Sequence, residues 1–510
     1  MIRKKMTRFF RIFLLAALVV PIVSTVGYAA TYYVATNGSD SNPGSLTAPF
    51  RTVQRSLDLL QAGDTCLVRG GTYNETLTLK RSGTSSAPIT IRNYLSETAT
   101  INSGTSKALV TGGRIHYYTI DGLRFISTFS SNNDYTLSFN NGIWDGDNNP
   151  EGGNNGFIII NCYIEGSILL YGHYNRVESC EINGKSSWTN GIREQFGSSH
   201  HNVYRNNTVY AFKERGIWSM QYTNYVLIEG NTIHDSQNMG IDIDGAAHPC
   251  YNATVRGNTI YKVAGRGIEM ENAFNSIVEN NVIHDSQLWG ISILNYGFGP
   301  DYTSDKEYRT TNTNSIFRNN LIYNTAQAGI ILFGSPGNKI YNNTIFGNKS
   351  TPGYFGAIAV RNYYQTNYPS SNTTIKNNLF ADNTGYSIWI DGNPTNLQMS
   401  NNLYYNSNGN INTHYWQGVG TYTLAKFKTD YGQESGSSFA NPLFRNATVF
   451  DFHIQSTSPA KDAGTTVSDV ISDIEGISRP QGSAYDIGAY EYSTTPASSA
   501  LPPPSNLRII

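Results

Sequence analysis

The sequence predicts an all-β solenoid, a stack of short strands and turns, and three observations support this. Charged residues make up only 14% of the 510 residues, against about 25% in ordinary soluble domains. Glycine (48 residues) and tyrosine (35 residues) are abundant, which favours strands and turns over helices. The third observation is an internal repeat, because a fixed sequence period is the signature of stacked structural units.

The repeat is a short motif of the type "NNTVY", "GNTIH" or "NNLIY", in which the second residue is always asparagine. Successive motifs lie 24, 27, 23, 39, 23, 35 and 24 residues apart, so the unit has about 23 to 24 residues and some units carry insertions. The repeated asparagines are Asn207, Asn231, Asn258, Asn281, Asn320, Asn343, Asn378 and Asn402.

We expect the repeated asparagines to point inward and to bond to one another from coil to coil. A single coil cannot bury its apolar face without its neighbours. Cys162 and Cys180 fall in the same column one coil apart. We interpret them as stacked core thiols, with a disulfide as the alternative. His234 and His284 occupy equivalent places two coils apart with Tyr261 between them, which predicts surface stacking.

A glycine nine residues after most of these asparagines starts a second strand in each coil. Side chains alternate between the two faces of a strand, so alignment on these glycines predicts two outward columns. The first column is Arg193, Trp218, Asp242, Glu269, Ser292, Ile331, Ile358 and Trp389. The second column is Gln195, Met220, Asp244, Glu271, Leu294, Phe333, Val360 and Asp391.

The chain divides into five segments. Residues 1–29 combine basic residues, the apolar run "IFLLAALVVPIV" and the small-residue site "GYAA", the layout of a secretory signal peptide. Residues 30–100 form an N-terminal helical cap with the first coils, 101–413 the solenoid, and 414–492 a small C-terminal cap. Residues 493–510 are rich in Pro and Ser and are expected to form a flexible tail.

These features resemble a known superfamily. The repeats are similar to the right-handed parallel β-helix of the pectate lyase superfamily, and "YYVATNGSDSNPGSLTAPFRTVQRSLDLLQAGDTCLVRGGTY" resembles the N-terminal segment of its secreted polysaccharide lyases. The stretch "SPAKDAG…SRPQGSAYDIGAYEY" resembles the C-terminal segment, of the choice-of-anchor type, that follows such helices in secreted bacterial proteins. The resemblance implies a β-helix fold and leaves several reactions open.

Four carboxylates form the candidate site. Asp242 and Asp244 in "GIDIDG" and Glu269 and Glu271 in "GIEMEN" occupy both outward columns of two adjacent coils. Like charges this close raise one another's pKa unless a cation neutralises them. The four acids are therefore candidate catalytic residues and candidate ligands of Ca²⁺, which takes six to eight oxygen ligands.

Basic and aromatic residues surround the acids in the sequence. Lys213, Arg215 and Arg266 precede the strands and are candidates for a catalytic base. Long insertions follow the same strands, and such insertions tend to mark the binding face of a repeat protein. The expected substrate-binding residues are Arg193, Trp218, His248, Tyr296, Arg309, Arg361 and Trp389.

Four functions fit this groove. The first is a Ca²⁺-dependent lyase that cleaves a uronate-containing polysaccharide by β-elimination. The second is an inverting glycoside hydrolase that uses two of the acids, since strand neighbours lie about 7 Å apart and such enzymes need about 6.5 to 9.5 Å. The third is a C5-epimerase, because "GIDIDG" is similar to the G-x-D-P-H-D segment of mannuronan C5-epimerases, although only Asp242 matches its functional residues. The fourth is a non-catalytic polysaccharide-binding or surface protein.

Charge and composition exclude other partners. Lys and Arg number 36 against 37 for Asp and Glu, so a net charge of −1 provides no field that attracts nucleic acid or an anionic membrane. After signal cleavage no segment is long and apolar enough to span a bilayer. We expect a secreted or cell-surface monomer whose partner is a polysaccharide.

Overall fold

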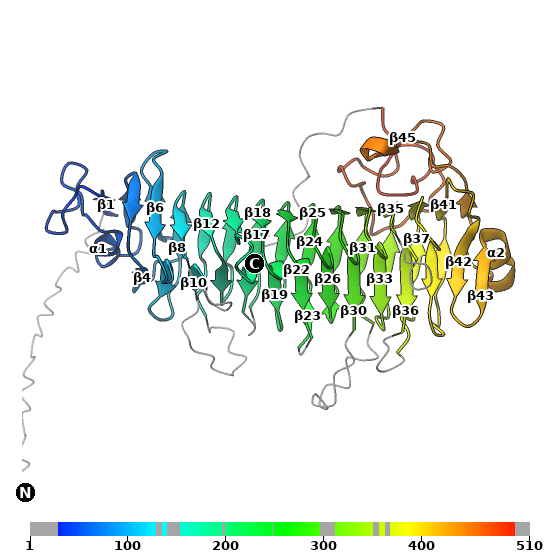
Figure 1. The fold of residues 1–510 in the computed structure, drawn as a ribbon, viewed down its shortest axis with the longest axis horizontal. Helices are drawn as coiled ribbons and strands as arrows, with labels where there is room; N and C mark the ends of the chain where they lie inside the picture. Colours follow the sequence, from blue (N-terminus) through cyan, green and yellow to red (C-terminus); the bar gives the residue numbers. More distant parts are fainter. Residues whose placement is uncertain are drawn as a thin grey trace, which may run out of the picture.

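The protein is a long rod of stacked coils, each made of three short strands (Figure 1). The computed structural model describes residues 29–128, 135–139, 153–195, 199–246, 248–295, 312–349, 356–362 and 368–494. Three sheets of 14 strands each run the length of the rod, and their strands pair in parallel except for the last pair of one sheet. The predicted parallel β-helix is confirmed.

Sheet A and sheet B meet at the corner that carries the repeated asparagines. Sheet A consists of β1 (Thr31–Val34), β2 (Thr65–Val68), β5 (Ile89–Asn93), β8 (Tyr118–Asp121), β11 (Ile158–Ile160), β14 (Arg176–Glu178), β17 (Val203–Arg205), β20 (Leu227–Glu229), β24 (Thr254–Arg256), β28 (Ile277–Glu279), β31 (Ile316–Arg318), β34 (Lys339–Tyr341), β37 (Thr374–Lys376) and β40 (Gln398–Ser400). Sheet B consists of β3 (Gly71–Tyr73), β6 (Ala99–Asn102), β9 (Arg124–Ile126), β12 (Tyr163–Glu165), β15 (Glu181–Asn183), β18 (Thr208–Tyr210), β21 (Thr232–His234), β25 (Thr259–Tyr261), β29 (Val282–His284), β32 (Leu321–Tyr323), β35 (Thr344–Phe346), β38 (Leu379–Ala381), β41 (Leu403–Tyr405) and β44 (Ser438–Phe439).

Sheet C carries the strands that begin at the repeated glycine of each coil. It consists of β4 (Leu77–Leu79), β7 (Leu109–Thr111), β10 (Leu137–Phe139), β13 (Ile168–Leu170), β16 (Asn190–Glu194), β19 (Arg215–Met220), β22 (Met239–Asp244), β26 (Ile268–Glu271), β30 (Ile291–Leu294), β33 (Ile330–Phe333), β36 (Ile358–Arg361), β39 (Ile388–Ile390), β42 (Asn412–Trp416) and β43 (Gly420–Thr423). Two small pairs complete the strands: β23 (Cys250–Tyr251) with β27 (Ala273–Phe274), and β45 (Phe444–Asn446) with β46 (Asp451–Ile454).

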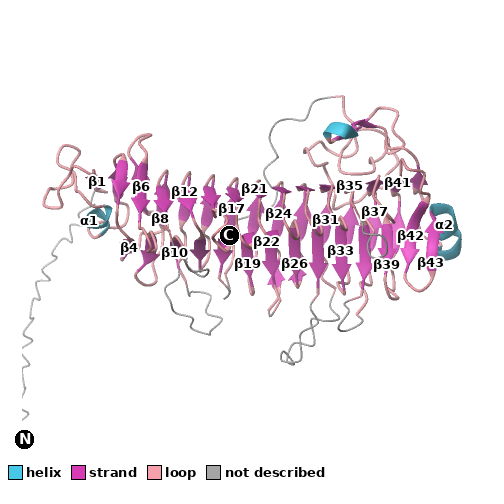
Figure 2. Ribbon diagram, in the orientation of Figure 1, coloured by secondary structure: helices cyan, strands magenta, loops and turns pink. Residues whose placement is uncertain are grey.

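A helix covers each end of the rod (Figure 2). At the N-terminal end, α1 (Val53–Leu57) confirms the predicted helical cap, and the carboxylate of Glu75 accepts the backbone N–H groups of Val53 and Gln54. At the other end, α2 (Leu424–Tyr431) packs Phe427 into the main core. No helix within the described ranges is long and apolar enough to cross a membrane.

The predicted asparagine ladder is confirmed. From Asn207 to Asn402, each side-chain Nδ2 donates to the Oδ1 of the next asparagine at 2.9 to 3.3 Å. In the seven coils from Asn207 to Asn378, the Oδ1 of the next asparagine also accepts the backbone N–H of the asparagine before it. The ladder ends where Asn402 donates to the buried carboxylate of Glu434 at 3.1 Å. Although burial acts to raise it, the pKa of Glu434 is held below its usual value, mainly by His414.

Two smaller predictions about stacked side chains are confirmed. Cys162 and Cys180 are buried, free thiols. His234 and His284 lie in a continuous ring stack on sheet B, with centroid separations of 4.7 to 5.2 Å between the successive rings of Tyr210, His234, Tyr261, His284 and Tyr323.

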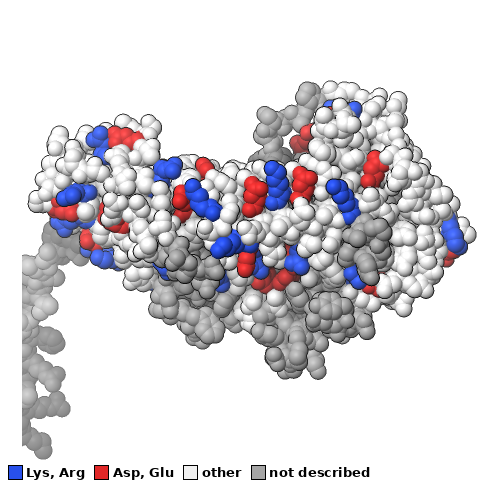
Figure 3. Space-filling view, viewed as in Figure 1, with Lys and Arg blue, Asp and Glu red and all other residues white. Residues whose placement is uncertain are grey.

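Sheet A carries an alternating charge ladder on its outer face, and acidic and basic side chains alternate along the middle of the rod in Figure 3. The paired positions, coil by coil, are Glu178, Arg205, Glu229, Arg256, Glu279 and Arg318. Arg205 and Arg256 both contact Glu229 at 2.6 Å. Opposite charges face each other in this ladder, which stabilises the register of the coils.

The C-terminal segment differs from the predicted end cap. Only the part around α2 covers the end of the rod, whereas residues 441–492 fold back along its side, above β35 and β41 in Figure 1. Phe452 and Ile474 pack against Leu321 and Tyr323. The side chains of asparagines at the corner before the ladder donate to backbone carbonyls of this segment, namely Asn319, Asn342, Asn377 and Asn401.

The ladder predicts a large cost for replacing one of its middle members. In Asn281→Ala, the bonds to Asn258, Asn320 and the Val255 carbonyl are lost. Each unsatisfied buried group costs about 1 to 3 kcal/mol, so we expect a loss of at least about 3 kcal/mol in the free energy of unfolding, measured by urea denaturation. The exposed Asn37→Ala variant is the matched control. Equal stability of the two variants would contradict a structural role for the ladder.

Candidate functional site

The four predicted acids lie together on sheet C. Asp242 of β22 pairs in register with Glu269 of β26, and Asp244 pairs with Glu271. Neighbouring strands are about 4.8 Å apart, so the four carboxylates form one compact cluster, as the sequence predicts. The acids are not on an open surface, however: Asp242 and Glu269 are 1% and 0% exposed, and Asp244 and Glu271 are each 8% exposed.

Two arginines form the layer outside the acids. Arg215 donates from Nε to Asp242 at 2.6 Å and from Nη1 to Glu214 at 2.7 Å. Arg266 places Nη1 2.7 Å from Glu269. The arginine side chains are 17% and 22% exposed, while their partners Asp242 and Glu269 are almost fully enclosed. The guanidinium groups are therefore more exposed to solvent than the carboxylates and form the outer layer of the site.

Tryptophan rings alternate with these guanidinium groups. The guanidinium carbons of Arg215 and Arg193 lie 4.1 and 4.5 Å from the Trp218 ring centroid, and that of Arg266 lies 4.8 Å from the Trp289 ring centroid. Distances below about 6 Å are typical of cation–π attraction. We call this surface, formed by Arg193, Arg215, Trp218, Arg266 and Trp289, the Arg–Trp strip.

Each member of the strip is held in place by polar contacts. Trp218 donates its indole N–H to Asp244 at 3.1 Å, and Arg193 donates to the hydroxyl of Tyr135 at 2.6 Å. Trp289 donates its indole N–H to Gln327 at 2.8 Å. The strip is therefore preorganised, which lowers the entropy lost when a ligand binds.

Sequence reasoning missed Trp289 and Tyr135. A signal for Trp289 was present, because it directly precedes Gly290 just as Arg215 and Arg266 precede their strand glycines. The residue before each strand glycine thus forms a third outward column. Tyr135 lies in a part of the chain without the repeat motif, and nothing in its local sequence marks it.

The electrostatics of the cluster favour bound protons. Burial raises the pKa of Asp242 to about 8; Arg215 opposes this shift, and the charges of Asp244 and Glu269 add to it. Burial also raises the pKa of Glu271 well above its usual value, with further contributions from Asp242 and Glu269. These shifts favour protonated carboxyl groups within the cluster. Although burial acts against it, Asp242 and Glu214 raise the pKa of Arg215, so its guanidinium stays charged.

The predicted calcium site does not fit this arrangement well. Within the described ranges, no group of three or more His, Cys, Asp or Glu side chains is arranged to hold a metal ion. Asp242 and Glu269 are engaged by arginines, and Asp244 accepts from Trp218 and from the Ala246 N–H. Ca²⁺ needs six to eight oxygens, whereas these carboxylates already contact arginine, tryptophan and backbone groups, so the calcium site stays a prediction.

The other predicted residues lie at different distances from the acids. Lys213 is exposed, two residues before Arg215. His248 follows Asp244 in the next turn and stacks on Tyr222 at 4.0 Å. Trp389 is buried in an apolar cluster four strands from β26 on sheet C, and Tyr415 and Trp289 of the Arg–Trp strip pack against this cluster. Tyr296 and Arg309 lie outside the described residues.

The predicted columns are wrong by one residue in the coil of β36. Ile331 pairs with Ala359 and Phe333 pairs with Arg361, whereas the prediction placed Ile358 and Val360 there. Ile358 and Val360 are core residues. Arg361 therefore lies in the second column, where it contacts Asp391 at 3.3 Å, three strands from the acid cluster of β26.

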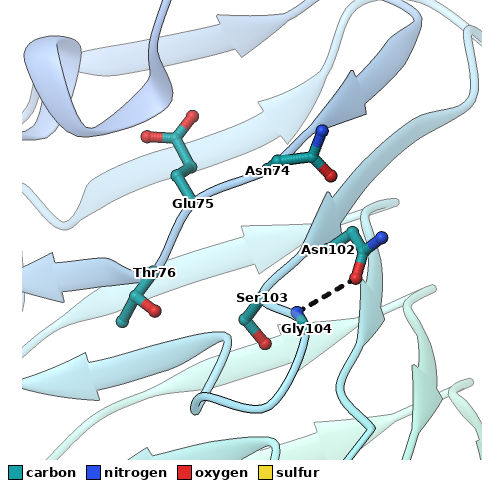
Figure 4. A pocket seen from close by; sticks show the side chains of 6 residues that line it. All are labelled: Asn74, Glu75, Thr76, Asn102, Ser103 and Gly104. Carbon is teal, nitrogen blue, oxygen red and sulfur yellow. Dashed lines mark hydrogen bonds between the residues drawn. The ribbon is translucent and has the colours of Figure 1, made fainter.

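A hollow of about 390 Å³ lies near the N-terminal end of the rod (Figure 4) and is lined by Asn74, Glu75, Thr76, Asn102, Ser103 and Gly104. Asn102 accepts the Gly104 N–H at 3.1 Å, and Glu75 is committed to the N-terminus of α1. Asn102 and Glu75 therefore have structural roles in this hollow.

Comparisons with known proteins agree with the fold. Residues 32–229 match the family model described as Pel9A-like, right handed beta helix region, and residues 303–424 match the model described as right handed beta helix region. The chain therefore contains a pectate lyase-like right-handed β-helix.

Relatives extend this picture. Uncharacterized protein YwoF of Bacillus subtilis is 26% identical over 495 residues, which cover 84% of this chain and 92% of YwoF. Pectate lyase PEL9 of Emericella nidulans is 41% identical over 76 residues, 14% of this chain and 18% of that protein. Among solved structures, a mutant of the PL6 family alginate lyase AlyGC shares the fold at 16% identity, with 75% of this chain and 56% of that chain covered and a TM-score of 0.52.

The raised pKa of Asp242 predicts a pH-dependent stability. The folded state holds this proton more tightly than the unfolded chain, so the Asp242 contribution to stability falls as pH rises from about 4 to about 8. In Asp242→Asn this contribution disappears, and the free energy of unfolding should fall less steeply over that window. Urea denaturation at a series of pH values measures both slopes. Identical slopes would show that Asp242 is ionised in the folded protein.

Proposed function

We propose that this protein is a secreted lyase that cleaves a uronate-containing polysaccharide by β-elimination. The observation that carries the proposal is the Arg–Trp strip above the buried acids. The family model and the short match to pectate lyase PEL9 support it. The apolar N-terminal run supports secretion, although residues 1–28 lie outside the described part of the chain.

The strip suits an acidic sugar chain in two ways. The guanidinium groups of Arg193, Arg215 and Arg266 are positively charged and carry N–H donors that suit a carboxylate. The flat faces of tryptophans suit the apolar faces of sugar rings, as aromatic surfaces in binding sites generally do. Asp242 and Glu269 hold the arginines in position from below.

β-Elimination needs a base and a proton donor beside the bound uronate. The base removes the proton from C5, the electron pair forms the C4=C5 double bond, and the C4–O bond breaks. The leaving oxygen then takes a proton. We assign the base to Lys213, another candidate from the sequence, whose amine must be in its neutral form to accept the proton, because the guanidinium of Arg215 stays charged beside its two carboxylate partners. Arg266 is likewise paired with Glu269.

Glu271 is the proposed proton donor. Burial and the neighbouring carboxylates raise its pKa well above its usual value, which favours the protonated form, and it lies at the more accessible edge of the cluster. Arginine neutralises the substrate carboxylate and stabilises the charge that develops when C5 loses its proton.

An inverting hydrolase is the second candidate. Asp242 with a pKa of about 8 has the protonation state of a general acid, and its position two residues from Asp244 gives about the separation that inverting enzymes use. Its contact with Arg215 and its burial place it behind the lyase. The epimerase and the non-catalytic binding protein remain predictions from the sequence, and the Arg–Trp strip would serve the binding protein as well.

We expect the full chain to release products with ultraviolet absorbance from the conjugated double bond when incubated with polygalacturonate or alginate. Lys213→Ala and Glu271→Gln should each lower kcat by at least about 100-fold, the usual contribution of a general base or acid. Arg215→Lys should mainly raise KM. Lys262→Ala removes an exposed lysine beside β25 on another face and is the matched control.

Three outcomes would redirect the proposal. New reducing ends without ultraviolet absorbance would indicate the hydrolase. Full activity in both Lys213→Ala and Glu271→Gln would show that the acid cluster is not the site. Loss of activity in EDTA that added Ca²⁺ restores would reinstate the calcium-dependent mechanism, whereas the arrangement of the arginines predicts activity without added metal.

A further inference from the structure

A second cavity lies at the C-terminal end of the rod, between the turn before β40 and helix α2. Its volume is about 450 Å³, within the range of about 300 to 1,000 Å³ that small-molecule sites occupy. Six of the residues that line it are Gln398, Met399, Trp416, Phe427, Tyr431 and Gln433.

The aromatic wall of this cavity is fixed in place. The rings of Trp416 and Tyr431 stack with centroids 4.8 Å apart and planes 28° apart. Trp416 donates its indole N–H to the Gly392 carbonyl at 2.8 Å, and the hydroxyls of Tyr431 and Tyr422 lie 2.9 Å apart. Both rings are only partly buried. They therefore offer a rigid aromatic surface to a ligand.

The polar groups of the cavity are amides. Gln433 accepts the Met399 N–H at 2.9 Å through its carbonyl, and Gln398 donates its amino group to Asn396 at 3.1 Å. Among the described residues, no further bond engages the Gln433 amino group or the Gln398 carbonyl. One donor and one acceptor therefore stand beside the aromatic wall.

We propose that this cavity is an auxiliary binding site for a neutral sugar. Aromatic rings match the C–H faces of a pyranose, and amide groups match its hydroxyls as donor and acceptor. No charged side chain lines the cavity in the described part of the chain. An acidic sugar would leave its charge partly desolvated there without a cation, which is costly.

The cavity is separate from the acid cluster. Trp416 lies in β42, five strands from β26 on sheet C, which corresponds to about 24 Å along the rod. The two sites also differ in chemistry, because arginines dominate one and amides the other. The neutral-sugar site therefore does not depend on the lyase proposal. The cavity would bind a neutral sugar unit of a glycan, at a place on the protein apart from the acid cluster.

Isothermal titration of the full chain with xylobiose, cellobiose and galactobiose tests this site, with digalacturonate as the acidic counterpart. We expect saturable binding of at least one neutral disaccharide. Trp416→Ala and Tyr431→Ala should weaken it at least about tenfold, as removal of an aromatic anchor from a binding site does. Trp289→Ala, which removes an indole from the Arg–Trp strip, should leave it unchanged.

Gln398→Ala guards against a folding artefact, because this side chain is exposed and its removal leaves the core intact. It should weaken binding several-fold with an unchanged unfolding temperature. The proposal is overturned if no neutral disaccharide binds, if Trp416→Ala and Gln398→Ala both bind normally, or if digalacturonate competes for the same cavity. None of these results bears on the ultraviolet assay of the acid cluster.

Discussion

The hydrogen-bonded asparagine ladder fixes how each coil stands on the next, and the rest of the molecule depends on that register. A shift by one residue would turn every outward side chain of a strand inward. The ladder bonds both side-chain and backbone groups from Asn207 to Asn402, and the sheet C strands of β22 and β26 follow their ladder asparagines at the same spacing. Asp242 therefore meets Glu269, and Asp244 meets Glu271.

The site is an electrostatic arrangement in two layers. Four acids brought this close repel one another, and burial makes their charged forms still less favourable. Two arginines above the acids, and protons bound among the acids, reduce this repulsion. A buried ion pair is weak evidence for stability on its own. In this site the ion pairs determine position, because they hold charged guanidinium groups between tryptophan rings at the surface.

The sequence predicted the coil period, the ladder and the pairing of the four acids, because each follows from counting residues between asparagine and glycine. It failed at β36, where the glycine stands thirteen residues after its asparagine and the count shifts by one. It also placed the acids at the surface, since a period says which face a side chain takes and nothing about which long side chain folds over it.

The repeat does not predict that residues 441–492 fold back along the rod. Part of the docking of this segment nevertheless depends on residues at the corner between sheets A and B. The later coils have asparagine before the ladder residue, as at Asn319 and Asn342, and these side chains hold the segment. In two earlier coils the residue before the ladder asparagine is Gly230 or Gly257, which has no side chain that could form such a bond.

The central claim is that arginines held by buried acids bind the uronate groups of a polysaccharide. A crystal structure of the Glu271→Gln variant soaked with a uronate oligosaccharide tests it most directly. A sugar ring should lie against Trp218 with its carboxylate on Arg215 or Arg266. An oligosaccharide bound on another face, with the Arg–Trp strip empty, would contradict it.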